Sequence, residues 1–117
     1  MRLLRLSGRK QNEWVKAKGA VWKGAHITIR WIQGSPHLPF ASSASADGVY
    51  MGTVASLKLD KSAVKRNRMR RRCREAFRLT VRDHALPAMQ LLLSPRSSSL
   101  RCDFRELLKD CARFLSS

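Results

Sequence analysis

Residues 61–82 read KSAVKRNRMRRRCREAFRLTVR and hold ten of the chain's 24 lysines and arginines but one acid, Glu75. Apolar residues recur in this stretch at spacings of three, four and five, which predicts a helix with one narrow apolar stripe. Most of the remaining positions are basic, and a helix of this length spans roughly 30 Å. We therefore expect a rod of positive charge that is anchored to a core along one stripe, formed by Val64, Met69, Cys73, Ala76, Phe77, Thr80 and Val81.

The start of this helix places cations where most helices carry acids. The first turn already bears about half a positive charge from the helix dipole, and only Asp60 and Ser62 are candidates to cap it. Lys65, Arg66 and Arg68 follow closely. Free backbone N–H groups, the dipole and these cations together form a site for phosphate. A basic face that is merely solvated is the alternative interpretation of such a charge run.

Residues 63–78, AVKRNRMRRRCREAFR, resemble the signature of the bacterial ribonuclease P protein subunit. That signature is Arg-Asn-Arg, a hydrophobe, two basic residues, two further positions and Arg-Glu-Ala-Phe, and the chain matches it at each place. Length and charge also fit, so the resemblance covers essentially all 117 residues. Asn67 argues against a merely solvated face, because asparagine is a poor helix former that can donate and accept hydrogen bonds toward a phosphate or a 2′-hydroxyl.

The resemblance implies an α+β fold, a small sandwich in the order helix-strand-strand-strand-helix-strand-helix, with a mixed sheet and a left-handed βαβ crossover. Such a crossover departs from the usual right-handed rule. We expect a single ribonuclease P protein-like RNA-binding domain over residues 1–117, with a modest core. Residues 33–48 hold Pro, Gly, Ser and Ala without periodicity, which predicts a mobile loop.

Periodicity predicts the remaining elements. A basic arm begins the chain and leads into a short helix from Lys10 to Lys18. Alternation predicts a half-buried strand over His26–Ile32, and apolar runs predict strands over Val49–Ala55 and Met89–Leu93. The three serines Ser97, Ser98 and Ser99 are expected to cap a last helix with the apolar face Leu100, Phe104, Leu107, Leu108, Cys111, Phe114 and Leu115.

The resemblance also implies which residues touch RNA. The single-stranded 5′ leader of precursor tRNA is expected on the outward strand face at His26, Thr28 and Arg30, with Trp14 as a candidate for stacking on bases. The family's aromatic position in the first helix is Asn12 here, so core packing is the alternative for Trp14. For His26 the alternative is an ordinary exposed strand position. The catalytic RNA is expected on the central helix and the basic residue before it, at Lys58, Lys65, Arg66, Asn67, Arg68, Arg70, Arg71 and Arg74.

Composition points to a polyanionic partner and excludes several other classes. A net charge of +16 and a pI near 11.4 make nucleic acid the default ligand. Three cysteines without a CxxC pair suggest neither a disulfide framework nor a zinc site, and we expect them to be reduced. The apolar runs are too short to span a bilayer, and the N-terminus lacks the apolar core of a signal peptide. We therefore expect a cytoplasmic protein that does not bind membranes.

The sequence does not predict an autonomous nuclease. The eight acids are scattered, and the three histidines have no evident nucleophile or carboxylate partner, so we expect no catalytic residue and no metal site in the chain. The resemblance implies a non-catalytic component of an endoribonuclease that removes the 5′ leader of precursor tRNA. The RNA subunit, with bound magnesium, would perform the hydrolysis. The partners of this chain would be that catalytic RNA subunit and precursor tRNA, with no obligate protein partner.

Two other classes of nucleic-acid-binding protein remain open. A small ribosomal or other structural RNA-binding protein would use the same charge and helix. A DNA-binding basic helix of the zipper type would need an adjoining heptad repeat, and Pro87 interrupts the chain soon after this helix. Reconstitution with a catalytic RNA discriminates between the ribonuclease P and ribosomal classes.

Overall fold

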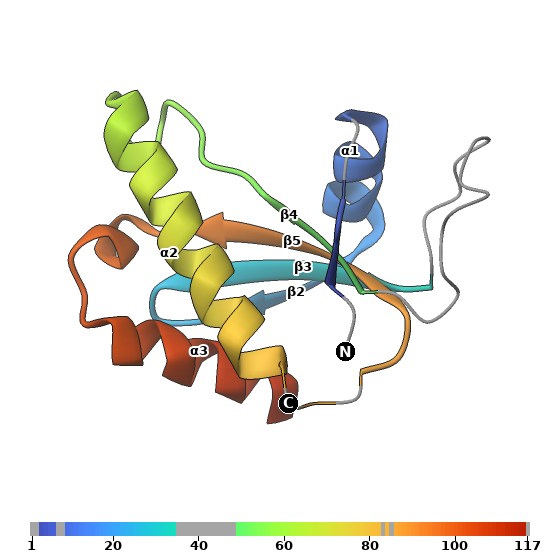
Figure 1. Ribbon diagram of the computed structural model, residues 1–117. Helices are drawn as coiled ribbons and strands as arrows, with labels where there is room; N and C mark the ends of the chain where they lie inside the picture. Colours follow the sequence, from blue (N-terminus) through green and yellow to red (C-terminus); the bar gives the residue numbers. More distant parts are fainter. Residues whose placement is uncertain (1–2, 7–8, 35–48, 83, 85, 117) are drawn as a thin grey trace.

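The computed structural model describes residues 3–6, 9–34, 49–82, 84 and 86–116 of the chain. The helix and strand order expected from the resemblance is present, with one further strand at the N-terminus (Figure 1). The elements are β1 (Leu3–Arg5), α1 (Arg9–Lys18), β2 (Ala20–Lys23), β3 (Ile27–Gln33), β4 (Val49–Thr53), α2 (Ala63–Val81), β5 (Met89–Pro95), the 3-10 turn η2 (Ser97–Leu100) and α3 (Phe104–Ser116).

The five strands form one mixed sheet in the order β1-β4-β5-β3-β2. β4 is parallel to both β1 and β5, whereas β3 is antiparallel to β5 and β2. α2 connects β4 to β5. In Figure 1 these two strands run toward the left, α2 lies in front of them and β5 lies below β4, so the crossover is left-handed. The α+β class, the mixed sheet and the unusual crossover are thus confirmed.

The first strand corrects the expectation of an N-terminal basic arm. Leu3 to Arg5 pair in parallel register with Val49 to Met51 of β4, and the N–H of Leu6 donates to the carbonyl oxygen of Met51 at 2.9 Å. β1 is too short for an alternation signal to mark it in the sequence. This part of the arm is therefore the edge strand of the sheet.

The larger core lies between the sheet and the helices α2 and α3, which cover the same face (Figure 1). Phe114 of α3 lies at its centre, with ring centroids of Trp22, Trp31 and Phe77 at 5.7, 6.2 and 6.4 Å. Tilted and edge-on pairs of this kind add to the stabilisation that burial gives. The aromatic cluster is surrounded by Ile27, Ile29, Val49, Met51, Cys73, Ala76, Val81, Met89, Leu91, Leu93, Leu107 and Cys111.

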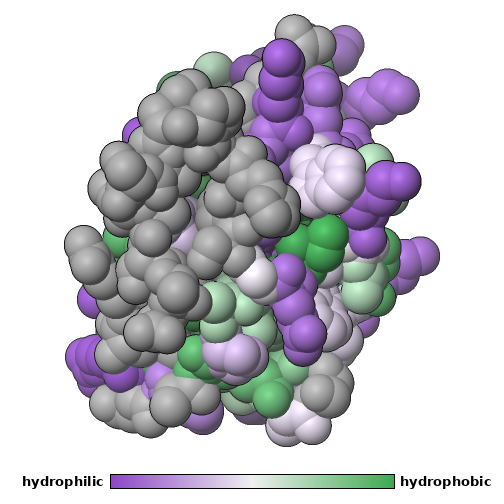
Figure 2. Space-filling view, turned by 90° about the vertical axis from the view of Figure 1, so that its right-hand side faces the viewer, coloured by the Kyte–Doolittle hydropathy of each residue, from purple (hydrophilic) through white to green (hydrophobic). Residues whose placement is uncertain are grey.

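The opposite face of the sheet carries α1. Val15 of α1 is fully buried in a small cluster with Leu92, whose neighbours on β5, Leu91 and Leu93, face the larger core. Trp14 is next to Val15 in the sequence but 48% exposed, so the core alternative for this side chain is wrong. Figure 2 views the end of the molecule that carries α1 and shows hydrophilic side chains at its upper right.

Two expectations about the helices are corrected. Val64 is 75% exposed, because the buried stripe of α2 begins only at Met69. Ser97, Ser98 and Ser99 do not cap the last helix. They form η2 together with Leu100, and α3 begins at Phe104, where Asp103 Oδ1 accepts the N–H of Arg105 at 2.9 Å.

The strand boundaries also differ from the expected ones. β3 begins after His26 and includes Gln33, whereas β4 ends at Thr53 rather than Ala55. The predicted loop over residues 33–48 lies outside the described residues from position 35 onward. Within the described chain, no helix combines the length and the apolarity that a membrane crossing requires.

Asp110 of α3 is a fully buried acid that ties this helix to the turn between β2 and β3. Its carboxylate oxygens accept the backbone N–H groups of Ala25, His26 and Ile27 at 3.2, 2.7 and 3.2 Å. Gly24 belongs to the same contact, because a Cβ atom there would lie 2.6 Å from Asp110 Oδ2. A side chain at this position would therefore displace the Asp110 carboxylate or the Trp22 ring.

We predict that Asp110→Ala lowers the free energy of unfolding by about 2–4 kcal/mol, because buried N–H donors lose their acceptor. Glu106→Ala is the matched control, since Glu106 is a part-exposed acid of the same helix that pairs with Lys109 at 3.4 Å. The control should change stability by less than about 1 kcal/mol. Urea unfolding followed by circular dichroism measures both, and equal losses would contradict the role given to Asp110.

Candidate nucleic-acid interface

The N-terminus of α2 is capped by the two residues that the sequence predicts. Ser62 Oγ accepts the N–H of Lys65 at 3.3 Å, and Asp60 Oδ1 accepts the N–H of Ser62 at 2.8 Å. The first turn contains no acid, and the side chains of Lys65 in that turn and of Arg68 in the next turn are exposed. The positive end of the helix dipole therefore faces solvent together with two cations, which favours an anion at this end.

Arg66 stabilises the start of the helix from within the protein. Its Nη1 atom donates to the carbonyl oxygens of Asp60 and Lys61 at 2.7 and 3.0 Å. The side chain thus fixes the turn that leads into α2, and its remaining N–H groups are the part available to a ligand. Lys58, in the same connection, is exposed.

An open groove of about 920 Å³ runs between α2, the edge strand β1 and α1. We call it the edge groove. Its cations come from two segments far apart in the sequence, Arg5 on β1 and four arginines on α2, and no Asp or Glu occurs among its described lining residues. The lining comprises Leu3, Leu4, Arg5, Leu6, Asn12, Met51, Gly52, Thr53, Val64, Asn67, Arg70, Arg71, Arg74 and Arg78.

Some of these arginines are held by neighbours that leave their charge in the groove. Arg70 donates to Asn67 Oδ1, and Arg74 Nη2 donates to Thr53 Oγ1 at 3.2 Å. Arg70 and Arg74 are thereby oriented by neutral acceptors, which do not neutralise them. A polyanion in the groove would meet guanidinium groups that are already positioned.

Arg78 differs from the other arginines of the groove because it pairs with an acid. Its guanidinium donates to both carboxylate oxygens of Glu75, and this bond lowers the pKa of Glu75 and raises the pKa of Arg78. Both groups are exposed, so this pair adds little stability. Among the described cations of the groove, Arg5 and Arg71 have neither an ion pair nor a side-chain hydrogen bond.

Asn12 contributes an unpartnered acceptor to the edge groove. Its Oδ1 atom is buried and has no hydrogen-bond partner among the described residues. A Cβ atom at Gly52 would lie 3.2 Å from this oxygen, so Asn12 reaches over the sheet to β4. A ligand that carries hydroxyl or amine donors could supply the missing bond.

The four residues expected to hold the leader are only partly brought together. Thr28 and Arg30 lie two positions apart on the α1 side of β3. Arg30 of β3 is the register partner of Leu92 on β5, and Leu92 is in turn the partner of Gly52 on β4, which lines the edge groove. Two strand spacings of about 5 Å each therefore separate Arg30 from that groove.

His26 and Trp14 lie apart from that pair. His26 precedes β3, and its Nδ1 atom is 2.8 Å from Ser98 Oγ, so the imidazole is engaged at the η2 end of the sheet. Trp14 is two residues from Asn12 on α1, which places the two side chains on different flanks of the helix. Lys18 Nζ lies 5.9 Å from the centroid of the Trp14 ring.

Solved structures share this arrangement of helices and strands. The ribonuclease P protein of Staphylococcus aureus superposes with a TM-score of 0.71 at 18% identity, covering 96% of this chain and 92% of that one. The ribonuclease P protein of Thermotoga maritima also gives a TM-score of 0.71, at 20% identity, with 95% and 94% covered. At these identities the likeness establishes the fold, which is that of a ribonuclease P protein.

The family itself follows from the sequence comparisons. The model of the family described as Ribonuclease P matches residues 1–117, and the chain belongs to this family. A ribonuclease P protein component from Thermus thermophilus is 33% identical over 114 residues, which are 97% of this chain and 59% of that relative. This chain thus spans 59% of the length of that relative. A ribonuclease P protein component from Synechococcus is 32% identical over 108 residues, with 91% and 84% covered. The resemblance inferred from the central motif is confirmed.

Sequence reasoning missed several residues of the edge groove, among them Arg5 and Asn12. Arg5 belongs to the chain start that was expected to be an arm, and its place beside α2 depends on the pairing of β1 with β4. Asn12 was noted only because it replaces an aromatic residue of the family. No local pattern marks either position, because both face the groove through contacts between distant segments.

The cysteines are free thiols without metal-site geometry. Cys73 and Cys111 are buried, and burial raises the pKa of each thiol to about 12. Cys102 is partly exposed, and burial raises its pKa as well. Within the described chain, His, Cys, Asp and Glu do not gather in groups of three or more that could hold a metal ion.

We predict that a disulfide reagent at pH 8 modifies Cys102 well before Cys73 and Cys111. The two buried thiols stay protonated and covered at this pH, and only a thiolate attacks the reagent. Ellman's assay should show one thiol reacting in the folded protein and the other two only after unfolding in urea. Cys102→Ser should abolish the early phase, and an early phase that survives this change would refute the prediction.

We also predict that Asn12→Ala raises the free energy of unfolding more than Asn67→Ala does. Both changes place a better helix former in a helix, but only the first removes a buried acceptor without a partner, which costs about 1–3 kcal/mol. Asn67 is exposed, and its Oδ1 accepts from Arg70. Thermal unfolding of the two variants measures the difference. Equal shifts would show that the Asn12 oxygen is satisfied in solution.

Proposed function

We propose that this chain is the RNA-binding subunit of ribonuclease P, which binds the catalytic RNA and the 5′ leader of precursor tRNA and so assists removal of the leader. The observation that carries the proposal is the concentration of cations on α2 and across the edge groove, of which only Arg78 is paired with an acid among the described lining residues. Unpaired, positioned guanidinium groups next to an open helix N-terminus fit a phosphate backbone. Membership of the Ribonuclease P family supports the same assignment.

In this proposal the chain binds and orients RNA, and the RNA subunit performs the phosphodiester hydrolysis. The magnesium ions that the hydrolysis requires are assigned to the RNA. The chain contributes positive charge that offsets phosphate repulsion where catalytic RNA and substrate meet. We place this activity in the cytoplasm.

The proposal divides RNA between two faces of the molecule. The catalytic RNA is assigned to α2, at Lys65, Arg66, Asn67, Arg68, Arg70, Arg71 and Arg74, together with Lys58. The leader is assigned to the α1 side of the sheet, where Thr28 and Arg30 lie. The exposed ring of Trp14 is a further stacking candidate, although it lies on another flank of α1 than Asn12. His26, which is bonded to Ser98, is the weakest of these assignments.

Reconstitution tests the proposal against the alternative of a structural RNA-binding protein. The full chain is added to the ribonuclease P RNA of the same organism, and cleavage of a precursor tRNA is followed as magnesium is lowered. A ribonuclease P subunit should lower the magnesium requirement, whereas a ribosomal protein should not.

Binding to the RNA should also weaken steeply with salt, with a slope of log K against log salt of roughly −4 to −5 for about six phosphates. A flat salt titration would contradict the proposal.

We predict that Arg68→Ala and Arg30→Ala produce opposite patterns of loss. Arg68→Ala should weaken assembly with the catalytic RNA first, because Arg68 is exposed on α2 and makes no hydrogen bond within the described chain. Arg30→Ala should weaken the binding of precursor tRNA with a leader of several nucleotides. It should leave the binding of mature tRNA and the assembly with the catalytic RNA nearly unchanged. The affinity of each variant for the catalytic RNA and for precursor tRNA measures this difference. Identical patterns of loss in the two variants would refute the two-face division.

A further inference from the structure

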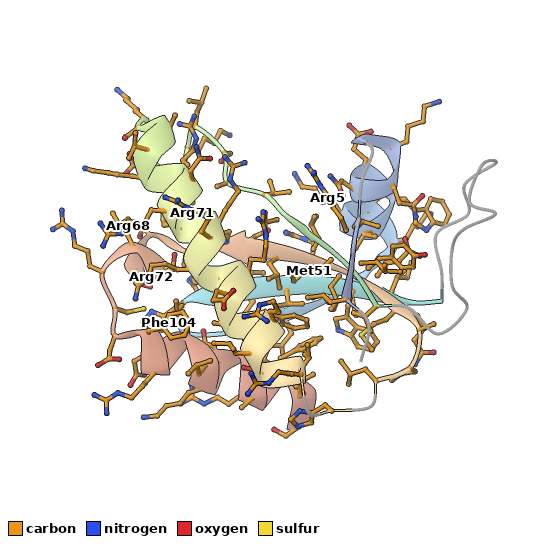
Figure 3. The ribbon with its side chains drawn as sticks, viewed as in Figure 1. Arg5, Met51, Arg68, Arg71, Arg72 and Phe104 are labelled. Carbon is orange, nitrogen blue, oxygen red and sulfur yellow. The ribbon has the colours of Figure 1, made fainter. Side chains whose placement is uncertain are left out.

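A second groove lies on the other flank of α2, and part of it comes from a segment outside the arginine-rich motif. It is open, has a volume of about 690 Å³, and we call it the second groove. Figure 3 shows Arg68 and Arg72 on the side of α2 that is nearer to Phe104, whereas Arg5 of the edge groove lies on the side toward α1. The lining comprises Val64, Lys65, Arg68, Arg72, Leu100, Arg101 and Cys102.

Arg72 builds this groove by fixing the connection between η2 and α3 to α2. Its Nη1 atom donates to the carbonyl oxygens of Ser99 and Leu100 at 2.8 and 2.7 Å, and its Nη2 atom donates to that of Cys102 at 2.5 Å. These bonds hold the backbone on both sides of Arg101. Arg101 is therefore presented beside the first turns of α2, although it follows Arg72 by 29 positions in the sequence.

The second groove concentrates positive charge that the protein leaves unpaired. Lys65, Arg68 and Arg101 are exposed, and in the described part of the chain none of the three side chains forms an ion pair or a hydrogen bond. No acid is among the described lining residues. The nearest acid along the chain, Asp103, is engaged by Arg105 at 3.1 Å. Cations held this close repel one another, and an anionic partner that spans both segments would relieve the repulsion.

The shape and composition of the groove suit the backbone of an RNA strand. Val64, which is 75% exposed, lines both the edge groove and the second groove. Leu100 and Cys102 provide a less polar wall beneath the cations. Apolar side chains can contact the riboses while the cations contact the phosphates.

We propose that the second groove binds a segment of the catalytic RNA and that Arg101 is a phosphate-contacting residue for it. This inference rests on the proposed function and extends the RNA interface around both flanks of α2. The catalytic RNA is the occupant because the groove shares Lys65 and Arg68 with the helix N-terminus that is assigned to it. Precursor leader is assigned to the other face of the sheet, where Arg30 lies on the α1 side, and α2 covers the opposite face.

The test compares Arg101→Ala with Arg105→Ala in the full chain. Both changes remove one exposed arginine from nearby positions, but Arg105 is paired with Asp103 and is not part of the groove. Affinity for the ribonuclease P RNA of the same organism is measured over a range of salt. Arg101→Ala should weaken binding several-fold and reduce the salt slope by about one. Arg105→Ala should change neither quantity, and Arg101→Lys should retain most of the slope. Thermal unfolding checks that each variant is folded.

The outcomes separate this inference from the proposed function. If the unaltered chain binds the RNA with a steep salt slope but Arg101→Ala behaves like Arg105→Ala, the role of the second groove is overturned and the proposed function stands. If Arg101→Ala instead loses the preference for precursor over mature tRNA while assembly is unchanged, the groove serves the substrate and the assignment to catalytic RNA is overturned. A chain that binds no ribonuclease P RNA overturns both.

Discussion

The burial of Phe77 between the sheet and α3 is the contact on which the rest of the structure depends. Phe77 is fully buried beside Phe114, and truncating such a side chain typically costs about 3–5 kcal/mol. Because the same stripe includes Cys73 and Ala76, this contact fixes the rotation of α2 about its axis. The direction of all remaining side chains on α2 is then fixed, and the cations point away from the core. The packing of one face thus determines where the charge of the molecule is displayed.

The arginines of the motif divide into those that hold the protein together and those that remain available. Arg66 and Arg72 donate to backbone carbonyl oxygens, and each fixes a connection that leads to or follows a helix. Arg68 and Arg71 make no such bonds within the described chain. An arginine-rich run can therefore serve two purposes at once, since a guanidinium that satisfies carbonyl groups keeps its charge. Arg72 fixes the backbone that forms the second groove, and the unpaired Arg71 and Arg68 line the edge groove and the second groove respectively.

In the proposed function, the position of α2 keeps the catalytic RNA and the single-stranded leader on different faces of the molecule. α2 and α3 cover one face of the sheet, and α1 covers part of the other, where Arg30 and Thr28 lie. The left-handed crossover puts α2 on the face that α3 also covers, and Arg5 of β1 and the arginines of α2 line the same groove. A polyanion that contacts α2 therefore meets positive charge on both flanks of the helix.

The sequence by itself determined the central helix, its caps, the buried stripe from Met69 onward and the family, because periodicity, charge and an uninterrupted motif are local properties. It also located β3 and β5 to within two residues, since alternation and an apolar run mark them. It did not reveal β1, the start of α3 at Phe104 or the role of Asp110. The start of α3 lies at a local contact, the bond from the N–H of Arg105 to Asp103 Oδ1, which the spacing of apolar residues does not mark. β1 and Asp110 depend on partners distant in the sequence, β4 and the β2–β3 turn. The same holds for Arg5 and Arg101, which are ordinary basic residues in the sequence. Only tertiary packing decided that they stand beside α2, because the energy that places them comes from contacts between segments and leaves no local pattern.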